Sequence, residues 1–209
     1  MQRLLATMRR LRGPGGCPWD QRQTHETLRP YLLEEAAEAV DALASGDPRV
    51  MADELGDVLL QIAFHAVIAE EEGSFGYDDV ETAIVEKLVR RHPHVFEGLT
   101  VDGVEGVLHN WNQIKAAERE AVGAAPRGAA DGVPRALPAL SRAAGLGRAL
   151  DWEPDRTLAA RPLAEAVATG DRAAFGAALL CLALLAQRAG VDPELALRDA
   201  LTARLEARP

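Results

Sequence analysis

Residues 32–61 read LLEEAAEAVDALASGDPRVMADELGDVLLQ, and this stretch decides the fold. On either side of Ser45-Gly46-Asp47-Pro48, apolar residues recur at three- and four-residue intervals, which is the spacing of one face of a helix. Glycine commonly ends a helix, and proline is favoured in the first turn of the next one. The stretch therefore predicts two long helices joined by a short turn, and helices joined in this way run antiparallel.

The rest of the chain gives the same kind of signal, and no segment alternates between apolar and polar residues as a strand would. We therefore predict an all-α fold, with Gly13–Asp20 as a loop and Thr24 as the cap of the helix that ends near Ser45. Other helices are expected near 2–12, 48–72, 78–92, 104–120, 135–149, 154–169, 171–189 and 193–207. Residues 121–133 lack large apolar groups, so we predict domains at 1–120 and 134–209 with a linker between them.

The charge of the chain is unevenly distributed. The formal net charge is −9, and residues 1–120 alone hold 12 Lys/Arg against 22 Asp/Glu, a net of −10. Residues 121–209 hold 11 against 10, a net of +1. A protein that binds the phosphate backbone of nucleic acid needs a basic face, so we expect no nucleic-acid partner.

The cysteine content and the apolar runs bear on location. Cys17 and Cys181 are too few for a disulfide framework, which indicates a reducing compartment. The N-terminal sequence MQRLLATMRRLRG lacks the apolar core of a signal peptide. The longest apolar run, 173–186, is shorter than the ~20 residues of a membrane span. We therefore expect a cytoplasmic protein that does not associate with membranes.

Acidic residues recur at three- and four-residue spacing on both helices of the predicted hairpin, so each helix presents them on one side. They are Glu34, Glu35, Glu38 and Asp41 on the first helix, and Asp53, Glu54 and Asp57 on the second. Like charges at this spacing cost roughly 0.2–0.5 kcal/mol per pair, a cost that a bound cation would offset.

The distances along the chain from the turn bring four of these carboxylates into register. Glu38 lies about as far before the turn as Glu54 lies after it, and Glu35 and Asp57 match in the same way. Packed antiparallel, the helices would gather four carboxylates into an all-oxygen site of the kind that Mg²⁺ prefers, with Mn²⁺ as an alternative ion. The competing interpretation is a solvated acidic helix face that binds nothing.

The sequence resembles a known family, the MazG nucleoside triphosphate pyrophosphohydrolases. The resemblance extends over about residues 3–120, and the metal motif of the family, ExxE followed by ExxD, falls on Glu35, Glu38, Glu54 and Asp57. The segments that carry it are GCPWDQRQTHETLRPYLLEEAAEAVDAL (16–43), DELGDVLLQIAFHAVIAEEEGSF (53–75), EKLVRRHPHVF (86–96) and VLHNWNQIKAAER (107–119).

The resemblance implies an all-α bundle that forms a homodimer. It also implies Mg²⁺-dependent hydrolysis of standard or non-standard nucleoside triphosphates to a nucleoside monophosphate and pyrophosphate. Glu38 or Glu35 would act as the general base. Residues expected to contact the nucleotide are Tyr31, Glu34, Lys87, Arg90, Arg91, Trp111 and Lys115. Trp111 could instead be a core or interface aromatic, and the cations of 87–91 could be a solvated helix end.

Some members of this family carry two such domains in tandem, and residues 134–208 look like a shortened, degenerate second MazG-like domain. AEAVATGDRAAFGAALLCLALLAQ (164–187) echoes EAVDALASGDPRVMADELGDVLLQ (38–61) once a three-residue gap is allowed. In that alignment the four metal positions correspond to Ala159, Pro162, Phe175 and Ala178, and none of these is a carboxylate. We therefore predict that this region holds no catalytic Mg²⁺.

Two alternatives stay open. The first is a narrow-specificity hydrolase of the same all-α superfamily, acting on dUTP or phosphoribosyl-ATP. The second is a non-enzymatic helical regulator, which should have lost its metal ligands in both halves, whereas here only the second half lacks them.

Overall fold

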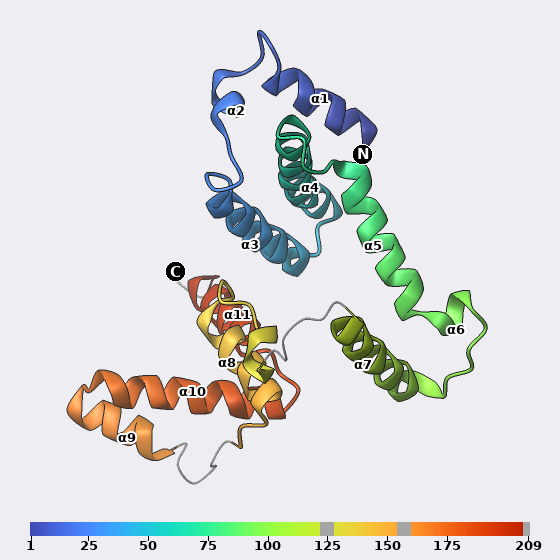
Figure 1. Ribbon diagram of the computed structural model, residues 1–209. Helices are drawn as coiled ribbons and strands as arrows, with labels where there is room; N and C mark the ends of the chain where they lie inside the picture. The colour runs from blue at the N-terminus through green and yellow to red at the C-terminus, as the bar shows by residue number, and fades with distance from the viewer. Residues whose placement is uncertain (122–127, 154–159, 207–209) are drawn as a thin grey trace. The chain divides into compact units, whose positions relative to one another are not determined.

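The computed structural model describes residues 1–121, 128–153 and 160–206, and every regular element in these ranges is helical (Figure 1). The predicted all-α class is confirmed. The chain divides into two compact units, residues 1–118 and 119–209. The elements are α1 (Gln2–Arg12), α2 (Pro18–Arg22), α3 (Arg29–Ser45), α4 (Pro48–Glu71), α5 (Tyr77–Arg91), α6 (Pro93–Phe96), α7 (Gly103–Ala121), the 3₁₀ turn η1 (Ala129–Gly132), α8 (Ala139–Leu150), α9 (Ala160–Thr169), α10 (Arg172–Arg188) and α11 (Pro193–Glu206).

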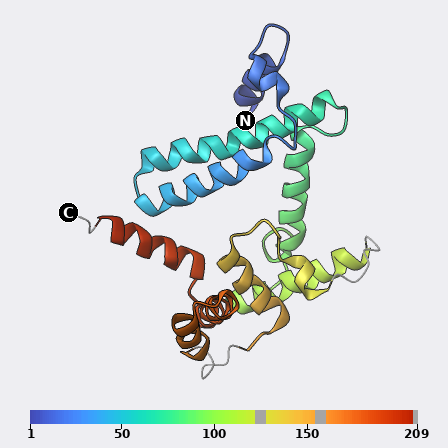
Figure 2. The same cartoon turned by 90° about the vertical axis from the view of Figure 1, so that its left-hand side faces the viewer.

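Helices α3 and α4 form the hairpin of the first unit and lie side by side along their length (Figure 2). Gly46 ends α3 in the left-handed region at φ 69°, a conformation that costs little only for glycine. Asp47 then caps α4, because its carboxylate accepts the backbone N–H of Arg49 at 2.8 Å. The Ser45 hydroxyl accepts the N–H of Asp47 at 3.1 Å, so side chains on both sides of Gly46 fix the turn.

The approach to α3 differs from the sequence-based expectation. Pro18 starts the short helix α2 inside the segment predicted as a loop. Thr24 does not cap α3: its hydroxyl accepts the N–H of Thr27 at 3.2 Å, and the hydroxyl of Thr27 accepts the N–H of Thr24 at 2.9 Å. These reciprocal bonds close a separate turn, so α3 begins only at Arg29.

The core of the first unit lies where α1 packs on the C-terminal half of α4. Leu5 and Met8 of α1 are buried against Phe64 and Val67 of α4, with Leu28 beside them. Burial of side chains of this size contributes about 1.5–3 kcal/mol each.

Two ion pairs clamp α1 to the end of α4. Arg9 binds both carboxylate oxygens of Glu70 at 2.8 Å, and Arg12 pairs with Glu71 at 2.7 Å. The Arg12 side chain is only 6% exposed, and it also donates to the backbone carbonyl of Gln23. Arg12 therefore fastens the segment after α2 as well as α4.

The leucines of the hairpin outside this core are covered far less. Leu33 is 57% exposed, Leu43 51%, Leu55 48% and Leu59 41%. These exposed leucines, which come from both helices, make up what we call the apolar face of the hairpin. Large exposed apolar surfaces commonly mark interaction sites.

The second unit contains a hairpin of its own, formed by α9 and α10. Gly170 has φ 69°, Asp171 caps α10 by accepting the N–H of Ala174 at 2.8 Å, and the Thr169 hydroxyl accepts the N–H of Asp171 at 3.1 Å. Helix α8 packs on α10 at Gly147, where an added Cβ would collide with the side chain of Leu184. The predicted helical residues 154–159 lie outside the described residues.

The two hairpins match without the three-residue gap of the sequence alignment, because α4 and α10 each begin one residue after the capping aspartate. Counted from the caps, Glu54 corresponds to Ala178 and Asp57 to Cys181, rather than to Phe175 and Ala178. Ala159 and the side chain of Pro162 lie outside the described part of the chain. Both mappings leave α10 without a carboxylate at these positions.

Within the described ranges, no single helix has the length and apolarity that a membrane span requires. The pair 172–188 and 193–205 passes by length and composition only, and it is bent by 104° at its break.

Candidate metal and nucleotide site

The α3/α4 hairpin brings three carboxylates together. Glu35 and Glu38 lie three residues apart on one side of α3, and Glu54 lies on α4. Each offers one oxygen such that all three atoms lie within 4.8 Å of one another. Glu35 and Glu54 are half-buried, and Glu38 is exposed. The group is thus open to solvent on one side and backed by two helices on the other.

Asp57 lies close enough to this group to affect its ionisation. Burial, then Asp57 and Glu38, raise the pKa of Glu35. Burial, then Glu38 and Asp57, raise the pKa of Glu54. The strongest charge partner across the hairpin is therefore Asp57 for Glu35 and Glu38 for Glu54. Mutual repulsion of this kind favours either a proton or a bound cation.

The donor set fits a hard divalent cation. All four side chains are carboxylates, the oxygens of three of them converge, and the open side leaves room for water or phosphate oxygens. Mg²⁺ is usually held by one or two carboxylates, with waters and substrate phosphates as its remaining ligands. Glu35, Glu38, Glu54 and Asp57 are the residues that could hold it.

A second cluster joins the end of α5 to α7 in the same unit. Arg90 and Arg91 both bind the carboxylate of Glu118, each at 2.7 Å. The two arginines lower the pKa of Glu118 to about 2, with Arg91 as the larger cause. The guanidinium of Arg91 also lies over the ring of Trp111, 5.2 Å from its centroid, and the ring of His92 meets Trp111 edge-on.

This cluster contains three of the residues expected to contact a nucleotide: Arg90, Arg91 and Trp111. Lys87 is exposed on α5, and Lys115 is exposed on α7 with an interaction partner of its own. Among the described residues α7 makes no extensive contact with α3 or α4. Arg90, Arg91 and Trp111 thus form a group on α5 and α7, whereas the carboxylates lie on α3 and α4.

The other two expected residues lie on α3. Tyr31 is 37% exposed, and its ring meets the ring of Trp19 edge-on with the ring centroids 5.7 Å apart. The ring of Trp19 meets that of Phe64 edge-on as well, with the centroids 6.2 Å apart. Glu34 is exposed, and its charge contributes to the raised pKa of Glu35. Both residues therefore lie beside the carboxylate cluster on the same helix.

Two features were missed by sequence reasoning. Glu118 lies in the segment 107–119 that carries the family resemblance, but only its partners Arg90 and Arg91 on α5 single it out. His65 forms an Nδ1–Nδ1 hydrogen bond of 2.7 Å with His25, and the two rings stack. These residues are 40 positions apart, so no local pattern could pair them.

The first unit is thus an all-α protein whose central hairpin gathers carboxylates in an ExxE and ExxD arrangement. Residues 23–96 match the model of the MazG nucleotide pyrophosphohydrolase domain. The chain belongs to the MazG family, and the matched segment contains the whole carboxylate cluster.

Relatives of the chain are found in several bacteria. It is 42% identical over 189 residues to an uncharacterised 26.1 kDa protein of Streptomyces cacaoi, an alignment that covers 88% of this chain and 72% of that one. It is 49% identical over 144 residues to the nucleoside triphosphate pyrophosphohydrolase of Escherichia coli K12, an alignment that covers 68% of this chain and 54% of that protein. It is 50% identical over 139 residues to the uncharacterised protein YabN of Bacillus subtilis, an alignment that covers 66% of this chain and 28% of YabN. The alignments thus span about half of the Escherichia coli protein and less of YabN.

Proposed function

We propose that this chain hydrolyses nucleoside triphosphates to a nucleoside monophosphate and pyrophosphate with Mg²⁺ as the cofactor. The observation that carries the proposal is the convergence of the Glu35, Glu38 and Glu54 oxygens within 4.8 Å, with Asp57 beside them. The name of the Escherichia coli relative, nucleoside triphosphate pyrophosphohydrolase, supports the same reaction.

The chemistry divides between the two clusters. A triphosphate carries several negative charges, and an acidic hairpin accepts it only when a divalent cation neutralises the phosphates and activates water. Glu38, or Glu35 with its raised pKa, would take the proton of the water that attacks the α-phosphorus.

Release of the pyrophosphate leaving group needs positive charge. Arg90 and Arg91 could supply it by exchanging Glu118 for phosphate oxygens, since guanidinium groups bind both through paired hydrogen bonds. Trp111, with Arg91 on its face, could stack on the base and would tolerate any base. Lys87 and Lys115 add positive charge on the same two helices.

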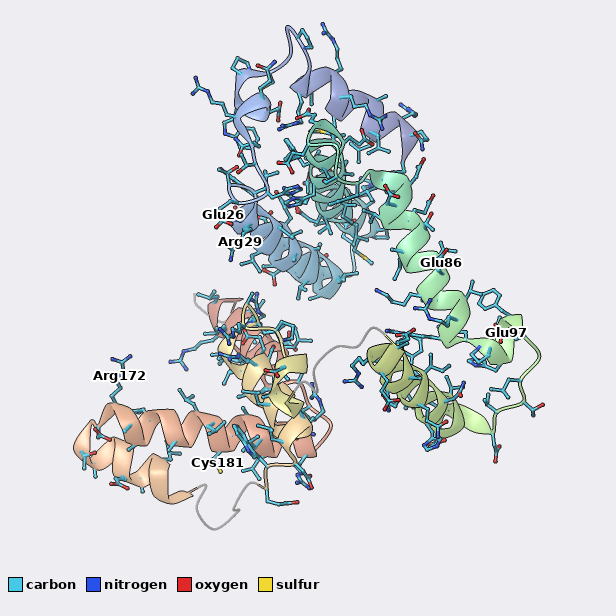
Figure 3. All side chains as sticks on the ribbon, in the orientation of Figure 1. Glu26, Arg29, Glu86, Glu97, Arg172 and Cys181 are labelled. Atoms are coloured by element: carbon cyan, nitrogen blue, oxygen red, sulfur yellow. The ribbon has the colours of Figure 1, made fainter. Side chains whose placement is uncertain are left out.

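Product analysis tests the reaction. The protein is incubated with Mg²⁺ and a panel of nucleoside triphosphates, dUTP and phosphoribosyl-ATP included, beside Glu38→Gln. We expect monophosphate and pyrophosphate from the wild type and a loss of both in the variant. Glu26→Gln is the matched control, because Glu26 is an exposed acid 78% open to solvent whose partner is Arg29 (Figure 3). EDTA should stop the reaction, and Mg²⁺ or Mn²⁺ should restore it.

The other outcomes discriminate the alternatives. Diphosphate and orthophosphate as products would mean that a different phosphoanhydride bond is cleaved. Turnover of dUTP or phosphoribosyl-ATP alone would favour the narrow-specificity hydrolase. No turnover of any substrate, with Mg²⁺ binding absent by calorimetry, would favour the regulator.

We further propose that the protein is a homodimer in which a second copy covers the apolar face of α3 and α4. Leu33, Leu43, Leu55 and Leu59 are each more than two-fifths exposed, and covering such side chains is favourable by about 25 cal/mol per Å². Isologous contacts between two copies of one patch are the commonest way in which such faces are buried.

The mass of the protein in solution tests the dimer. Light scattering should give twice the 22.4 kDa of one chain for the wild type and a single-chain mass for Leu59→Lys. Leu108→Lys, on an exposed position of α7, is the control and should leave the mass unchanged. A monomeric wild type would refute the proposal.

The remaining proposals concern environment. We place the protein in the cytoplasm, where nucleoside triphosphates are available and where thiols such as Cys17 and Cys181 stay reduced; no disulfide joins the two. The net charge of −10 over residues 1–120 argues against a nucleic-acid or anionic-membrane partner.

A further inference from the structure

The second unit contains a pocket that the proposed reaction does not use. It has a volume of about 450 Å³ and lies between the segment around η1 and the first half of α8. Arg135 and Arg142 line it together with Asp131, and Val133 and Leu146 form its apolar wall. A volume of this size is in the range of small-molecule sites.

The wall of the pocket is held tightly. Val133, just after η1, packs on α8 at Gly145, where an added Cβ would lie 3.0 Å from a methyl group of Val133. The 3₁₀ turn itself is closed by Asp131, whose carboxylate accepts the backbone N–H of Gly128 at 2.8 Å. The cavity is therefore bounded by packed backbone on one side and by a helix on the other.

The described residues do not neutralise the positive charge of the two arginines that line the pocket. The Nε atom of Arg142 is buried, and within the described residues it has no hydrogen-bond acceptor. No carboxylate in the described ranges forms an ion pair with Arg142 or with Arg135. Asp131 is the nearest acidic group in the lining, and its carboxylate is already bound to Gly128. Buried N–H donors in proteins nearly always have an acceptor in the protein, a water molecule or a ligand, and an anion in this pocket would supply one beside two positive charges.

We propose that this pocket binds a phosphate-bearing small molecule of about the size of a nucleoside monophosphate. Two guanidinium groups match the oxygens of a phosphate, which they can hold by paired hydrogen bonds. The volume exceeds that of a single phosphate ion, and Val133 and Leu146 offer an apolar surface for the rest of the ligand. The charge of the region agrees, because residues 121–209 carry a net of +1 against −10 for residues 1–120.

Calorimetry on the full chain with AMP as the probe, in EDTA, tests this site. Without a divalent cation the carboxylate cluster of the first unit repels phosphates, and the arginine variants separate binding in this pocket from any binding at Arg90, Arg91 and Trp111. We expect AMP to bind the wild type and to bind Arg142→Gln about tenfold less tightly or worse, because a charge-assisted hydrogen bond is lost. Arg148→Gln is the matched control: it makes the same charge change on an exposed position of the same helix, outside the pocket lining, and should bind as the wild type does.

Further variants keep the test decisive. If Arg142→Gln loses its helical circular dichroism, Arg135→Gln replaces it, since Arg135 is exposed and its loss should weaken AMP without unfolding the unit. Glu38→Gln should bind AMP normally, which separates this site from the proposed catalytic one. No AMP binding by the wild type, or equal losses in Arg142→Gln and Arg148→Gln, would overturn the proposal. Pyrophosphate that binds as tightly as AMP would refute the nucleoside part of the assignment.

Discussion

The α3/α4 hairpin turns at Ser45-Gly46-Asp47, and the α9/α10 hairpin turns at Thr169-Gly170-Asp171, with matching hydrogen bonds from hydroxyl and carboxylate side chains. Both glycines have φ 69°. Beyond the turn the two hairpins differ in the side chains that face between their helices.

The difference lies in what occupies equivalent positions. Glu54 and Asp57 of α4 correspond, by distance from the turn, to Ala178 and Cys181 of α10. Ala178 is 3% exposed and packed inside the second unit, whereas Glu54 is half-buried among other carboxylates. Cys181 projects from the middle of α10 (Figure 3). The turn thus specifies a helical hairpin, and the residues two helical turns further on decide whether the hairpin can bind a cation or serves only in packing.

The largest expected effect contrasts Asp57 with Cys181. Asp57→Asn removes the charge of one proposed metal ligand, and we expect the rate of monophosphate release to fall about 10²-fold or more, because metal stabilisation of the transition state amounts to several kcal/mol. Cys181→Ala should change the rate by less than about twofold, within the noise of such measurements. Steady-state kinetics with one triphosphate and Mg²⁺ measures both. Equal losses would mean that the second hairpin takes part in catalysis.

The two turns should respond alike to one substitution. Gly46→Ala and Gly170→Ala each force a side chain into the left-handed region, and each should lower the free energy of unfolding by about 1–2 kcal/mol. Gly176→Ala is the control: Gly176 is helical with open space around it, so this change should raise stability by up to about 1 kcal/mol. Urea unfolding followed by circular dichroism reports all three. If only Gly46→Ala lowered the free energy of unfolding, the two turns would not be equivalent.

Metal binding should stabilise only the first hairpin. At ten times its dissociation constant, Mg²⁺ should add about 1.4 kcal/mol to the free energy of unfolding of the wild type. This corresponds to a rise of roughly 3–6 °C in Tm for a chain of this size. Glu54→Gln should abolish the rise, whereas Cys181→Ala should keep it. A rise that persists in Glu54→Gln would place the ion elsewhere.

A smaller effect of opposite sign is expected without metal. In EDTA, Glu54→Gln should be slightly more stable than the wild type, because it removes a carboxylate whose charged form is disfavoured by burial and by repulsion from Glu38 and Asp57. Glu194→Gln on α11 provides the contrast, since Glu194 pairs with Arg198 and its loss should not stabilise the protein. Chemical denaturation at low ionic strength resolves the difference. A destabilised Glu54→Gln would indicate that the carboxylate has a structural partner.

Histidines occur only in the first unit, so a mild pH dependence should be confined to it. Burial and the nearby His25 lower the pKa of His65 below its value in the unfolded chain, about 6.5. Between these two pKa values the unfolded state binds more protons, so stability falls as the pH drops below about 6.5. Glu72, 3.7 Å from Nε2 of His25, and the ring of Phe75 are the other groups that face the pair.

Unfolding of the wild type and of His65→Asn between pH 7.5 and 5.5 measures this dependence. The variant should show a flatter profile, because it keeps a hydrogen-bonding side chain but cannot be protonated. His109→Asn is the control, since His109 is exposed on α7 and should leave the profile unchanged. A steeper profile for His65→Asn would contradict the assignment.

Much of this architecture could be predicted because its signals are local. Gly46 and Asp47 mark the turn, and helical periodicity fixes which residues face between α3 and α4, so the grouping of Glu35, Glu38 and Glu54 follows from counting. The start of α3 could not be obtained in this way. The Thr24–Thr27 turn competes with a helix cap, and both use the same residue types.

Contacts between distant residues lay outside the reach of local patterns. The bonds from Arg90 and Arg91 to Glu118 span 28 and 27 positions, and nothing in the sequence around Glu118 marks it as their partner. The pocket beside Arg142 belongs to the same kind, because it depends on how the segment after η1 folds back on α8. The difference in net charge between residues 1–120 and 121–209 is visible in the sequence. The sequence does not show that Arg135 and Arg142 line one pocket.

A turn of only two residues between α3 and α4 also constrains how this protein can change over generations. A point substitution at Glu35 or Asp57 removes one oxygen donor and leaves the others where they are. A one-residue insertion or deletion beside Gly46 would instead rotate α4 by about 100° relative to α3 and misplace both of its donors at once. We therefore expect homologous genes to vary the length of the segment 45–47 only where the carboxylates have already been lost, so that codon deletions there would mark lineages that no longer use the site.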